Sequence, residues 1–291
     1  MPSGIRRVLP FDRAAGWVSE QVRARVPRAD MAERDPEFIE RALELSWRLV
    51  RVYFRAEIKG IERVPERGPM LLVGNHSGGN VSPEVVVTTL AFTRHFGPQR
   101  PFYQLAHDLV MAFPVLGGYL RKFGTVAADP DSARAALDSG AAVLVYPGGD
   151  WEVHRPAWEQ DRIDFAQRTG FLRLAWDARV PIVPVINYGA HENQLILTRG
   201  DRIARLLRLD RMLRLKVFPI SLALPWGLNL GDLAGHIPLP TKVTVEFLDP
   251  IDLRAVLGAE LDPQRGYDHV TGVMQRALKR LAADRTLPVL G

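Results

Sequence analysis

Short apolar runs that alternate with helical segments constrain the fold of this chain more than any other feature. Five segments have the length and composition of strands: residues 56–60, 69–74 (PMLLVG), 141–146 (AAVLVY), 181–187 (PIVPVIN) and 241–247 (TKVTVEF). Capping residues and helical spacing predict four helices among them: 83–94, Asp131 or Ser132 to Gly140, 163–177 and 265–283. Strands separated by helices predict a mainly parallel α/β sheet flanked by helices.

The first 55 residues are expected to form a helical extension that precedes a single α/β domain of residues 56–291. Asp35 and Pro36 begin a segment in which Phe38, Ile39, Leu45 and other apolar residues recur at helical spacing. We see neither an internal repeat nor a clear linker, so one domain with a helical N-terminal extension is the simplest organisation.

Composition excludes several classes of protein and site. Hydrophobic residues make up 47% and charged residues 24%, as in ordinary globular chains. The absence of cysteine excludes disulfides, a thiol nucleophile and cysteine-ligated metal. No tract reaches the ~18 to 20 apolar residues of a membrane-spanning helix, and no apolar stretch follows Arg6 and Arg7 as in a signal peptide. We therefore expect a cytoplasmic protein, peripheral on the inner face of the membrane.

The excess positive charge is concentrated in residues 199–216. Lys and Arg outnumber Asp and Glu by 38 − 33 = 5 in the whole chain, and this segment alone holds seven basic and two acidic residues, 7 − 2 = 5. Leucines between the arginines predict contact with an anionic membrane surface. Arginines spaced by three drift around a helix, so an Arg-rich helix packed on the core is the alternative. Nucleic acid is not expected as a partner, because no aromatic residues interleave with the arginines.

The first candidate site is the loop GNHSGGNVSPE at residues 74–84. His76 directly follows a predicted strand, and Gly78 and Gly79 allow a sharp turn. A Ser-Pro pair then begins a helix, which places Glu84 in its first turn. A neutral histidine with a nearby carboxylate can act as a general base. The alternative is a buried histidine bonded to backbone, with Glu84 only complementing the helix dipole.

The second candidate site is the turn YPGGDWEVHR at residues 146–155. Gly148 and Gly149 at a strand end expose backbone N–H groups. Asp150, Glu152 and Arg155 place polar side chains directly behind them. The alternative is a tight turn with ordinary surface charges.

Taken together, these motifs resemble those of the glycerolipid acyltransferase superfamily, the 1-acylglycerol-3-phosphate acyltransferases and their diacylglycerol-acyltransferase-like relatives. The resemblance runs from about residue 60 to 252 and rests on four motifs: NHSGG at 75–79, FGTVAADP at 123–130, LVYPGG at 144–149 and VPIVPV at 180–185. In that family a histidine, followed by an aspartate five residues later, deprotonates an acceptor hydroxyl that attacks an acyl thioester. The resemblance implies this role for His76.

The chain departs from the family pattern in its acid and in its phosphate-binding residues. Val81 stands where the aspartate is expected, so Glu84 is the nearest candidate, and Glu152 is a substitute carboxylate for His76 or for the acceptor. The usual Pro-Glu-Gly-Thr-Arg turn reads Pro-Gly-Gly-Asp-Trp here, and the arginine that follows the FGTVAA-like stretch in phosphate-acceptor enzymes is not evident. Without these donors, we expect a mono- or diacylglycerol-like or glycolipid acceptor rather than lysophosphatidic acid.

The resemblance implies an acyltransferase that needs no metal and no bound cofactor, with acyl-CoA or acyl carrier protein as co-substrate. The catalytic residues would be His76, Glu84 and Glu152. The backbone N–H groups of the Gly-Gly pair would stabilise the oxyanion. The substrate-binding residues would be Asn75, Ser77, Gly78, Gly79, Gly148, Gly149, Asp150 and Arg155. The oligomeric state stays open.

Three other functions are alternatives to acyl transfer: serine hydrolysis, metal catalysis and lipid binding without catalysis. Serine hydrolysis by Ser77 is disfavoured because the Gly-x-Ser-x-Gly elbow is absent, and His191 belongs to no zinc-binding His-Glu-x-x-His motif. A non-catalytic lipid-binding protein on the same scaffold remains an alternative, because the family's aspartate is missing. The apolar segments 109–120 and 218–230 are expected to line an acyl channel or enter the membrane interface with Trp226 at headgroup level, with core burial as the alternative. Pro219, Pro225 and Gly227 exclude a regular helix from the second segment and favour a surface or lid segment.

Overall fold

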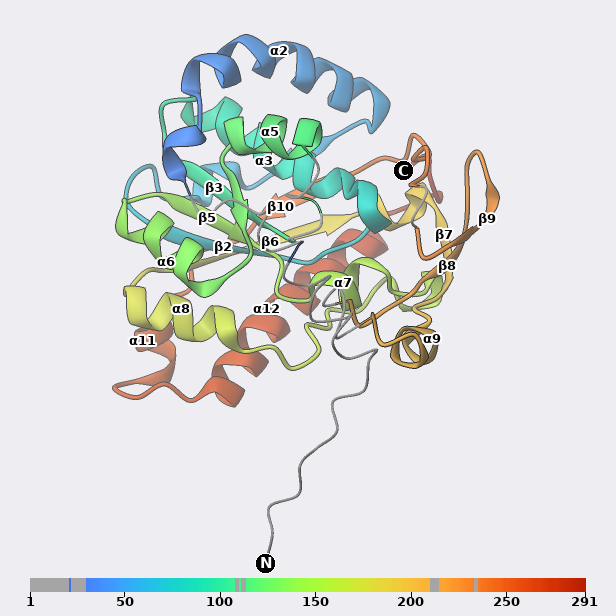
Figure 1. Ribbon diagram of the computed structural model, residues 1–291. Coiled ribbons are helices and arrows are strands. Elements are labelled where there is room, and N and C mark those ends of the chain that lie inside the picture. The colour runs from blue at the N-terminus through green and yellow to red at the C-terminus, as the bar shows by residue number, and fades with distance from the viewer. Residues whose placement is uncertain (1–20, 22–29, 108–109, 111–113, 210–214, 233–234) are drawn as a thin grey trace, which may run out of the picture.

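The computed structural model describes residues 21, 30–107, 110, 114–209, 215–232 and 235–291, and its centre is a seven-stranded sheet (Figure 1). The strand order is β1 (Glu57–Lys59), β10 (Thr244–Phe247), β6 (Ile182–Tyr188), β2 (Met70–Gly74), β5 (Ala142–Val145), β3 (Phe102–Ala106) and β4 (Thr125–Ala127). All neighbouring pairs are parallel except β10 and β6. The predicted mainly parallel α/β fold is confirmed.

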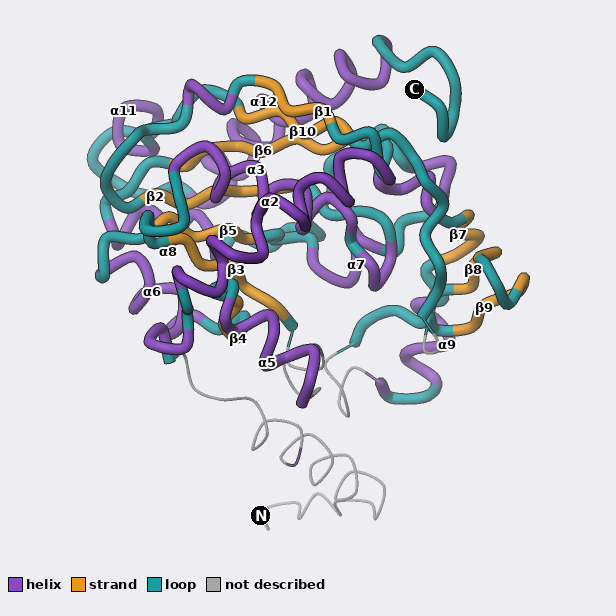
Figure 2. Tube along the Cα trace, turned by 90° about the horizontal axis from the view of Figure 1, so that it is seen from above, coloured by secondary structure: helices purple, strands orange, loops and turns teal. Residues whose placement is uncertain are grey.

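Helices cover both faces of this sheet. One face carries α3 (Pro83–Phe96) and α5 (Pro114–Lys122), with α2 (Pro36–Tyr53) outside them, and the other carries α6 (Pro130–Asp138), α8 (Gly170–Ala178), α11 (Leu253–Leu257) and α12 (Pro263–Ala283) (Figures 1 and 2). The side chains of β2 alternate between the two layers: Leu71 and Val73 pack in the cluster with α8 and α12, and Met70 and Leu72 in the cluster with α3. Burial on both faces makes β2 a central, rigid strand.

Helix α2 begins after its N-cap Asp35, as predicted, but its buried face differs from the expected one. Ile39, Leu43 and Trp47 pack against Leu90 and neighbouring residues of α3, following the i, i+4 ridge of a helix contact. By contrast, the apolar residues of its second half that extend the predicted spacing, at positions 45, 49 and 52, are exposed.

Two predicted helix starts are corrected. The side chain of Asp129 accepts from the backbone N–H of Ser132, so Asp129 caps α6 rather than Asp131 or Ser132. Helix α8 begins at Gly170 instead of 163, because Ala166 and Gln167 have positive φ and interrupt the helical backbone.

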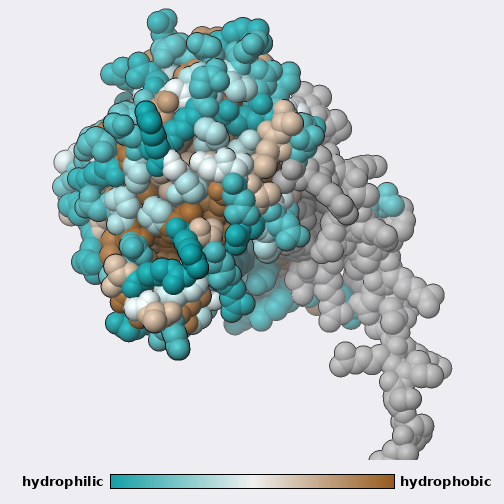
Figure 3. Space-filling view, turned by 90° about the vertical axis from the view of Figure 1, so that its left-hand side faces the viewer, coloured by the Kyte–Doolittle hydropathy of each residue, from teal (hydrophilic) through white to brown (hydrophobic). Residues whose placement is uncertain are grey.

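A second, antiparallel sheet lies at one end of the molecule, beside α9 (Asp201–Leu206) (Figures 1 and 2). It consists of β7 (Leu195–Thr198), β8 (Ile220–Ala223) and β9 (Gly227–Leu230), with β8 in the middle. The sequence predicted a surface or lid segment without a regular helix at 218–230; the segment lies at the surface, but it contains two strands that were not predicted. The opposite end is mainly hydrophilic around a hollow with apolar residues in its floor (Figure 3).

Candidate active site

The two loops singled out in the sequence meet at one edge of the main sheet. Strands β2 and β5 are adjacent and parallel, with Leu72 opposite Leu144, so their carboxyl ends open onto the same place. The ring of His76, which follows β2, stacks on the ring of Tyr146, which follows β5, with centroids 4.6 Å apart. The carboxyl edge of the sheet therefore carries both motifs in one site.

The imidazole of His76 is paired with the carboxylate of Glu84. Its Nδ1 lies 2.6 Å from Oε1 of Glu84, which also accepts the backbone N–H of Ser77 at 3.0 Å. Glu84 is fully buried, whereas 17% of the His76 side chain is exposed. When Nδ1 carries the hydrogen and donates it to Glu84, Nε2 is unprotonated and can accept a proton.

The loop conformation explains how an acid eight residues away reaches the ring. Gly78 and Gly79 have φ of 87° and 65°, values that favour glycine, and the following turn runs directly into α3. Pro83 takes the first position of that helix, as predicted, and Glu84 the second. The first turn of α3 thus places the Glu84 carboxylate beside the ring of His76, which follows β2.

Glu152 contacts the backbone of His76, not its ring. Its Oε2 accepts the backbone N–H of His76 at 2.9 Å, and its Oε1 lies 3.3 Å from the guanidinium of Arg155. Burial raises the pKa of Glu152 to about 7, although Arg155 and the His76 N–H oppose this shift. Within the described residues Glu84 is thus the carboxylate bonded to the imidazole, and Glu152 supports the loop.

Arg155 and Asp150, which the sequence predicts to bind substrate, make hydrogen bonds that hold the turn together. The buried Arg155 donates to the carbonyl of His76 at 2.6 Å and to that of Arg162. Asp150 pairs with Arg168 at 2.9 Å and accepts the backbone N–H of Lys216 at 2.7 Å. Burial alone would raise the pKa of Asp150, but these hydrogen bonds outweigh it and lower the pKa.

The Gly-Gly pair does not offer two free backbone donors. The N–H of Gly149 is used within the turn, where it donates to the carbonyl of Tyr146 at 3.0 Å. A Cβ on Gly148 would lie 2.4 Å from the side chain of Glu152. Glycine at position 148 is therefore needed for close packing against Glu152, and the expected oxyanion role of Gly149 is not supported.

Asn75 and Ser77 are fixed by Asn187, a residue of β6 that the sequence reasoning missed. The Asn75 amide donates to the Asn187 carbonyl at 3.0 Å and accepts its backbone N–H at 2.8 Å, and the Asn187 side chain also donates to the Asn75 carbonyl. The Ser77 hydroxyl donates to Oδ1 of Asn187 at 2.7 Å. Both residues are buried, so they position His76 from either side along the chain.

The glycine turn is held from outside by residues that no sequence motif indicated. Asn193 donates to the Gly78 carbonyl at 2.8 Å, and Asp232 accepts the backbone N–H of Asn80 at 2.9 Å. Asp232 also accepts from His236 at 3.0 Å. Burial alone would raise the pKa of Asp232, but the bonds from His236 and Asn80 lower it. These partners lie more than 100 positions from the turn, so only the fold brings them together.

The basic segment and the apolar segments are only partly described. Residues 210–214, and residues 109 and 111–113 of the first apolar segment, lie outside the described part of the chain. Arg199 is buried, pairs with Glu159 at 2.7 Å and stacks over Trp151, so the first arginine of the basic segment belongs to the protein interior. None of the described helices is long and apolar enough to cross a membrane.

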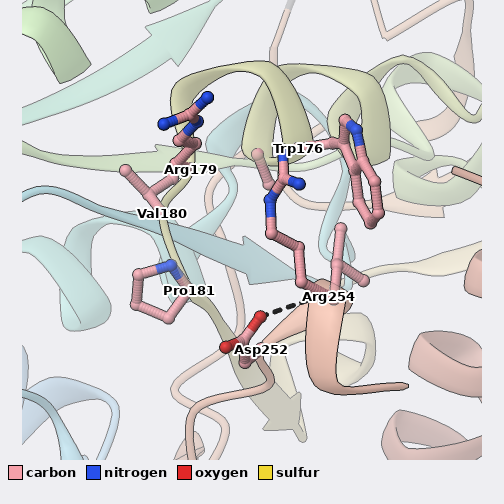
Figure 4. A pocket seen from close by; sticks show the side chains of 8 residues that line it. Trp176, Arg179, Val180, Pro181, Asp252 and Arg254 are labelled. Atoms are coloured by element: carbon pink, nitrogen blue, oxygen red, sulfur yellow. Dashed lines mark hydrogen bonds between the residues drawn. The ribbon is translucent and has the colours of Figure 1, made fainter. Parts of the chain in front are cut away.

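A cavity of about 330 Å³ lies at the other end of the parallel strands, next to the start of β6 (Figure 4). Trp176, Pro181 and Asp252 line it, together with Arg254, whose guanidinium stacks over the Trp176 ring at 4.3 Å. Because His76 follows the opposite, carboxyl end of β2, this cavity is separate from the candidate site.

Known proteins are similar to this chain over the region that carries both loops. The acyltransferase family model matches residues 55–187, which include both loops of the site. The protein ML2427 of Mycobacterium leprae is 31% identical over 238 residues, covering 80% of this chain. A Bos taurus protein named DGAT1/2-independent enzyme synthesizing storage lipids is 29% identical over 199 residues, 68% of this chain and 56% of that protein.

A solved structure shares the fold. The 1-acyl-sn-glycerophosphate acyltransferase PlsC of Thermotoga maritima aligns over 95% of this chain and 85% of its own, with a TM-score of 0.50 at 17% identity. This chain spans 62% of the length of its mycobacterial relative, so that relative is the longer protein. The chain is therefore similar to acyltransferases over residues 55–187, and its fold is similar to that of a 1-acyl-sn-glycerophosphate acyltransferase.

Proposed function

We propose that this chain transfers a fatty acyl group from a thioester, acyl-CoA or acyl carrier protein, to a hydroxyl of a lipid acceptor that lacks a phosphate monoester. The observation that carries the proposal is the 2.6 Å contact between Nδ1 of His76 and Glu84. A buried carboxylate on one ring nitrogen prepares the other nitrogen to take a proton and stabilises the imidazolium that results.

The proposed reaction is direct acyl transfer. Nε2 of His76 takes the proton of the acceptor hydroxyl while that oxygen attacks the thioester carbonyl carbon. The tetrahedral intermediate then breaks its C–S bond, and His76 returns the proton to the departing thiolate. The products are an ester and a free thiol, and His76 is again neutral.

The charge distribution around the site favours an acceptor without a phosphate monoester. Three arginines lie near the Pro-Gly-Gly turn, but each is already engaged: Arg155 with Glu152, Arg168 with Asp150 and Arg199 with Glu159. A phosphate monoester needs cationic donors that are available to it. The name of the Bos taurus relative, which refers to storage lipids, points to the same class of acceptor.

The proposal includes peripheral attachment to the inner face of an anionic membrane through residues 199–216. Arg202 and Arg205 of α9 are exposed, and Leu206 and Leu207 follow them at the surface. Basic side chains beside exposed leucines suit an anionic lipid surface. Arg199 is excluded from this surface by its burial.

The test is thiol release from palmitoyl-CoA and from the matching acyl carrier protein thioester, with diacylglycerol or lysophosphatidic acid as acceptor. We expect turnover with diacylglycerol, and a loss of roughly 10²- to 10⁴-fold in His76→Ala, the usual contribution of a general base. His95→Ala, an exposed histidine on α3, is the matched control and should keep full activity. Circular dichroism checks that both variants fold.

The other outcomes separate the alternatives. Preference for lysophosphatidic acid would identify a phosphate acceptor and refute the acceptor class. Lipid binding by the wild type without consumption of any thioester would identify a non-catalytic binding protein.

A further inference from the structure

The β7–β8–β9 sheet has its polar and apolar faces reversed. Side chains alternate along a strand, so each antiparallel pair places matched residues on the same face. In this sheet Ile196, Ser221 and Asn229 form the buried row, and Leu195, Leu222 and Leu228 form the row exposed to solvent. An antiparallel sheet with one free face ordinarily turns its leucines inward.

The exposed face, which we call the leucine face, continues along both strands of the β8–β9 hairpin. Its side chains are between 44% and 59% exposed: Leu195, Leu222, Leu224, Trp226, Leu228 and Leu230. Alternation keeps the leucines two apart along each strand on one side, and Trp226 stands at the hairpin turn. They form one patch rather than isolated apolar residues, and a patch of this kind marks a surface that binds something.

The buried face of the same sheet is connected to the His76 loop by hydrogen bonds through Asp232. The Asn229 side chain donates to Oδ1 of Asp232 at 2.9 Å, and Oδ2 of Asp232 accepts the backbone N–H of Asn80. A Cβ on Gly79 would lie 1.8 Å from the side chain of Gln194, the residue just before β7. The hairpin and the catalytic loop are therefore packed together with little free space.

Charge identifies the partner of the leucine face. Helix α9 lies beside the sheet in Figures 1 and 2. Its Arg202 and Arg205 are exposed, as is Leu206. Without the buried Arg199, residues 200–216 hold six basic and two acidic residues, a net charge of 6 − 2 = +4. A second copy of this chain would bring like charges together, whereas an anionic bilayer attracts them and accepts the leucines.

We propose that the leucine face docks on the surface of an anionic lipid bilayer, with Trp226 at headgroup level, and so sets the His76 loop at that surface. The inference rests on the proposed function, because an enzyme that acylates a bilayer lipid must receive its acceptor from the membrane. It assigns the contact to the β7–β8–β9 sheet, beyond the basic segment alone.

The test measures binding to phosphatidylcholine vesicles with and without phosphatidylglycerol. In the double variant Leu222→Gln with Leu228→Gln, we expect binding to phosphatidylglycerol vesicles to weaken roughly ten-fold or more. The control variant, Leu45→Gln with Leu49→Gln on α2, changes two leucines that are 65% and 62% exposed. It should bind as the wild type does, and Trp226→Phe should remove part of the fluorescence shift that vesicles cause.

Equal weakening in both double variants would overturn the proposal, as would unchanged binding in the first. A dimer of the wild type that the Leu222→Gln, Leu228→Gln variant loses would show that a second copy covers the leucine face. Thiol release with an acceptor dissolved as monomers is measured in parallel and should be unaffected by this variant. If the wild type releases no thiol, the proposed function is refuted, whereas the vesicle-binding result still tests the docking proposal.

Discussion

The substitution Glu84→Gln tests the charge of the acid that pairs with His76. A glutamine oxygen can still accept from Nδ1 and from the Ser77 N–H, as Oε1 of Glu84 does. The amide nitrogen takes the place of Oε2, which has no hydrogen-bond partner among the described residues. The variant therefore removes a negative charge while it keeps the size of the side chain and both hydrogen bonds.

The expected magnitude follows from the geometry. With Nδ1 and Oε1 2.6 Å apart, the centres of the imidazolium and carboxylate charges are about 4 Å apart, worth about 4 kcal/mol at an effective dielectric of about 20. That energy corresponds to roughly 10³ in rate, and the partial exposure of His76 reduces it. We expect kcat to fall roughly 10²- to 10³-fold with KM nearly unchanged, because the imidazolium forms only as the reaction proceeds.

Steady-state thiol release measures this effect, with Glu246→Gln as the control. Glu246 is also buried and pairs with Arg280 at 2.8 Å, but it lies on β10, outside the site. Its variant should keep the wild-type kcat. A kcat for Glu84→Gln within about three-fold of wild type, beside an inactive His76→Ala, would refute the proposed pairing and leave Glu84 a structural role at the start of α3.

Two further predictions concern the supports of the site. Because burial raises the pKa of Glu152 from 4.5 to about 7, the folded state binds more protons than the unfolded state between these values; its stability should fall as pH rises through them, by at most about 3 kcal/mol. The free energy of unfolding of Glu152→Gln, measured in urea, should lack this part of the pH dependence. If it changed with pH as steeply as that of the wild type, burial of Glu152 would not be the cause of the pKa shift. Thiol release should fall much more in Gly79→Ala than in Gly97→Ala. Both glycines have positive φ, but only at Gly79 would the new Cβ clash with a side chain, that of Gln194. Equal losses of activity would assign the effect to backbone strain alone.

The parts of the fold that the sequence predicted are those whose local pattern and tertiary role agree. Apolar runs became the central strands β2, β5 and β6, and the Ser-Pro pair began α3 where expected. Strand β3 was missed because Gln104 stands in its middle. This side chain is buried and accepts from Thr89 at 2.5 Å and donates to Thr125 at 2.8 Å, partners that come from other elements and leave no local signal.

The β8–β9 hairpin was missed for a different reason. Pro219 and Pro225 interrupt its apolar pattern, and its leucines face solvent while Ser221 and Asn229 face inward. Alternation tells which residues share a face but not which face is buried, and the usual assumption that leucines face the core gives the wrong answer in this sheet.

Within the site, the sequence indicated His76 and Glu84 because Glu84, in the first turn of α3, follows His76 by only eight residues. It could not indicate Asn187, Asn193 or Asp232, since those residues hold the loop from strands and turns far along the chain. It also indicated Glu152 as a carboxylate for His76 or for the acceptor, and the structure shows an oxygen of Glu152 bonded to the His76 backbone. Loop residues are predictable from spacing, but the residues that fix the loop depend on tertiary packing.

The displaced acid and the second sheet are linked by the same loop. An acid five residues after the histidine would be held within the loop itself, whereas Glu84 lies on α3, three residues beyond Val81. The turn between His76 and α3 must then keep its shape without an internal acid, and two glycines make it intrinsically adaptable. Besides the hydrogen bond from Ser82 to the Gly79 carbonyl within the turn, Asn193 before β7 and Asp232 after β9 hold it from outside. Residues that flank the leucine-bearing sheet therefore also support the turn between His76 and Glu84, so we expect a change at the hairpin base to lower the rate of thiol release without touching the reacting atoms.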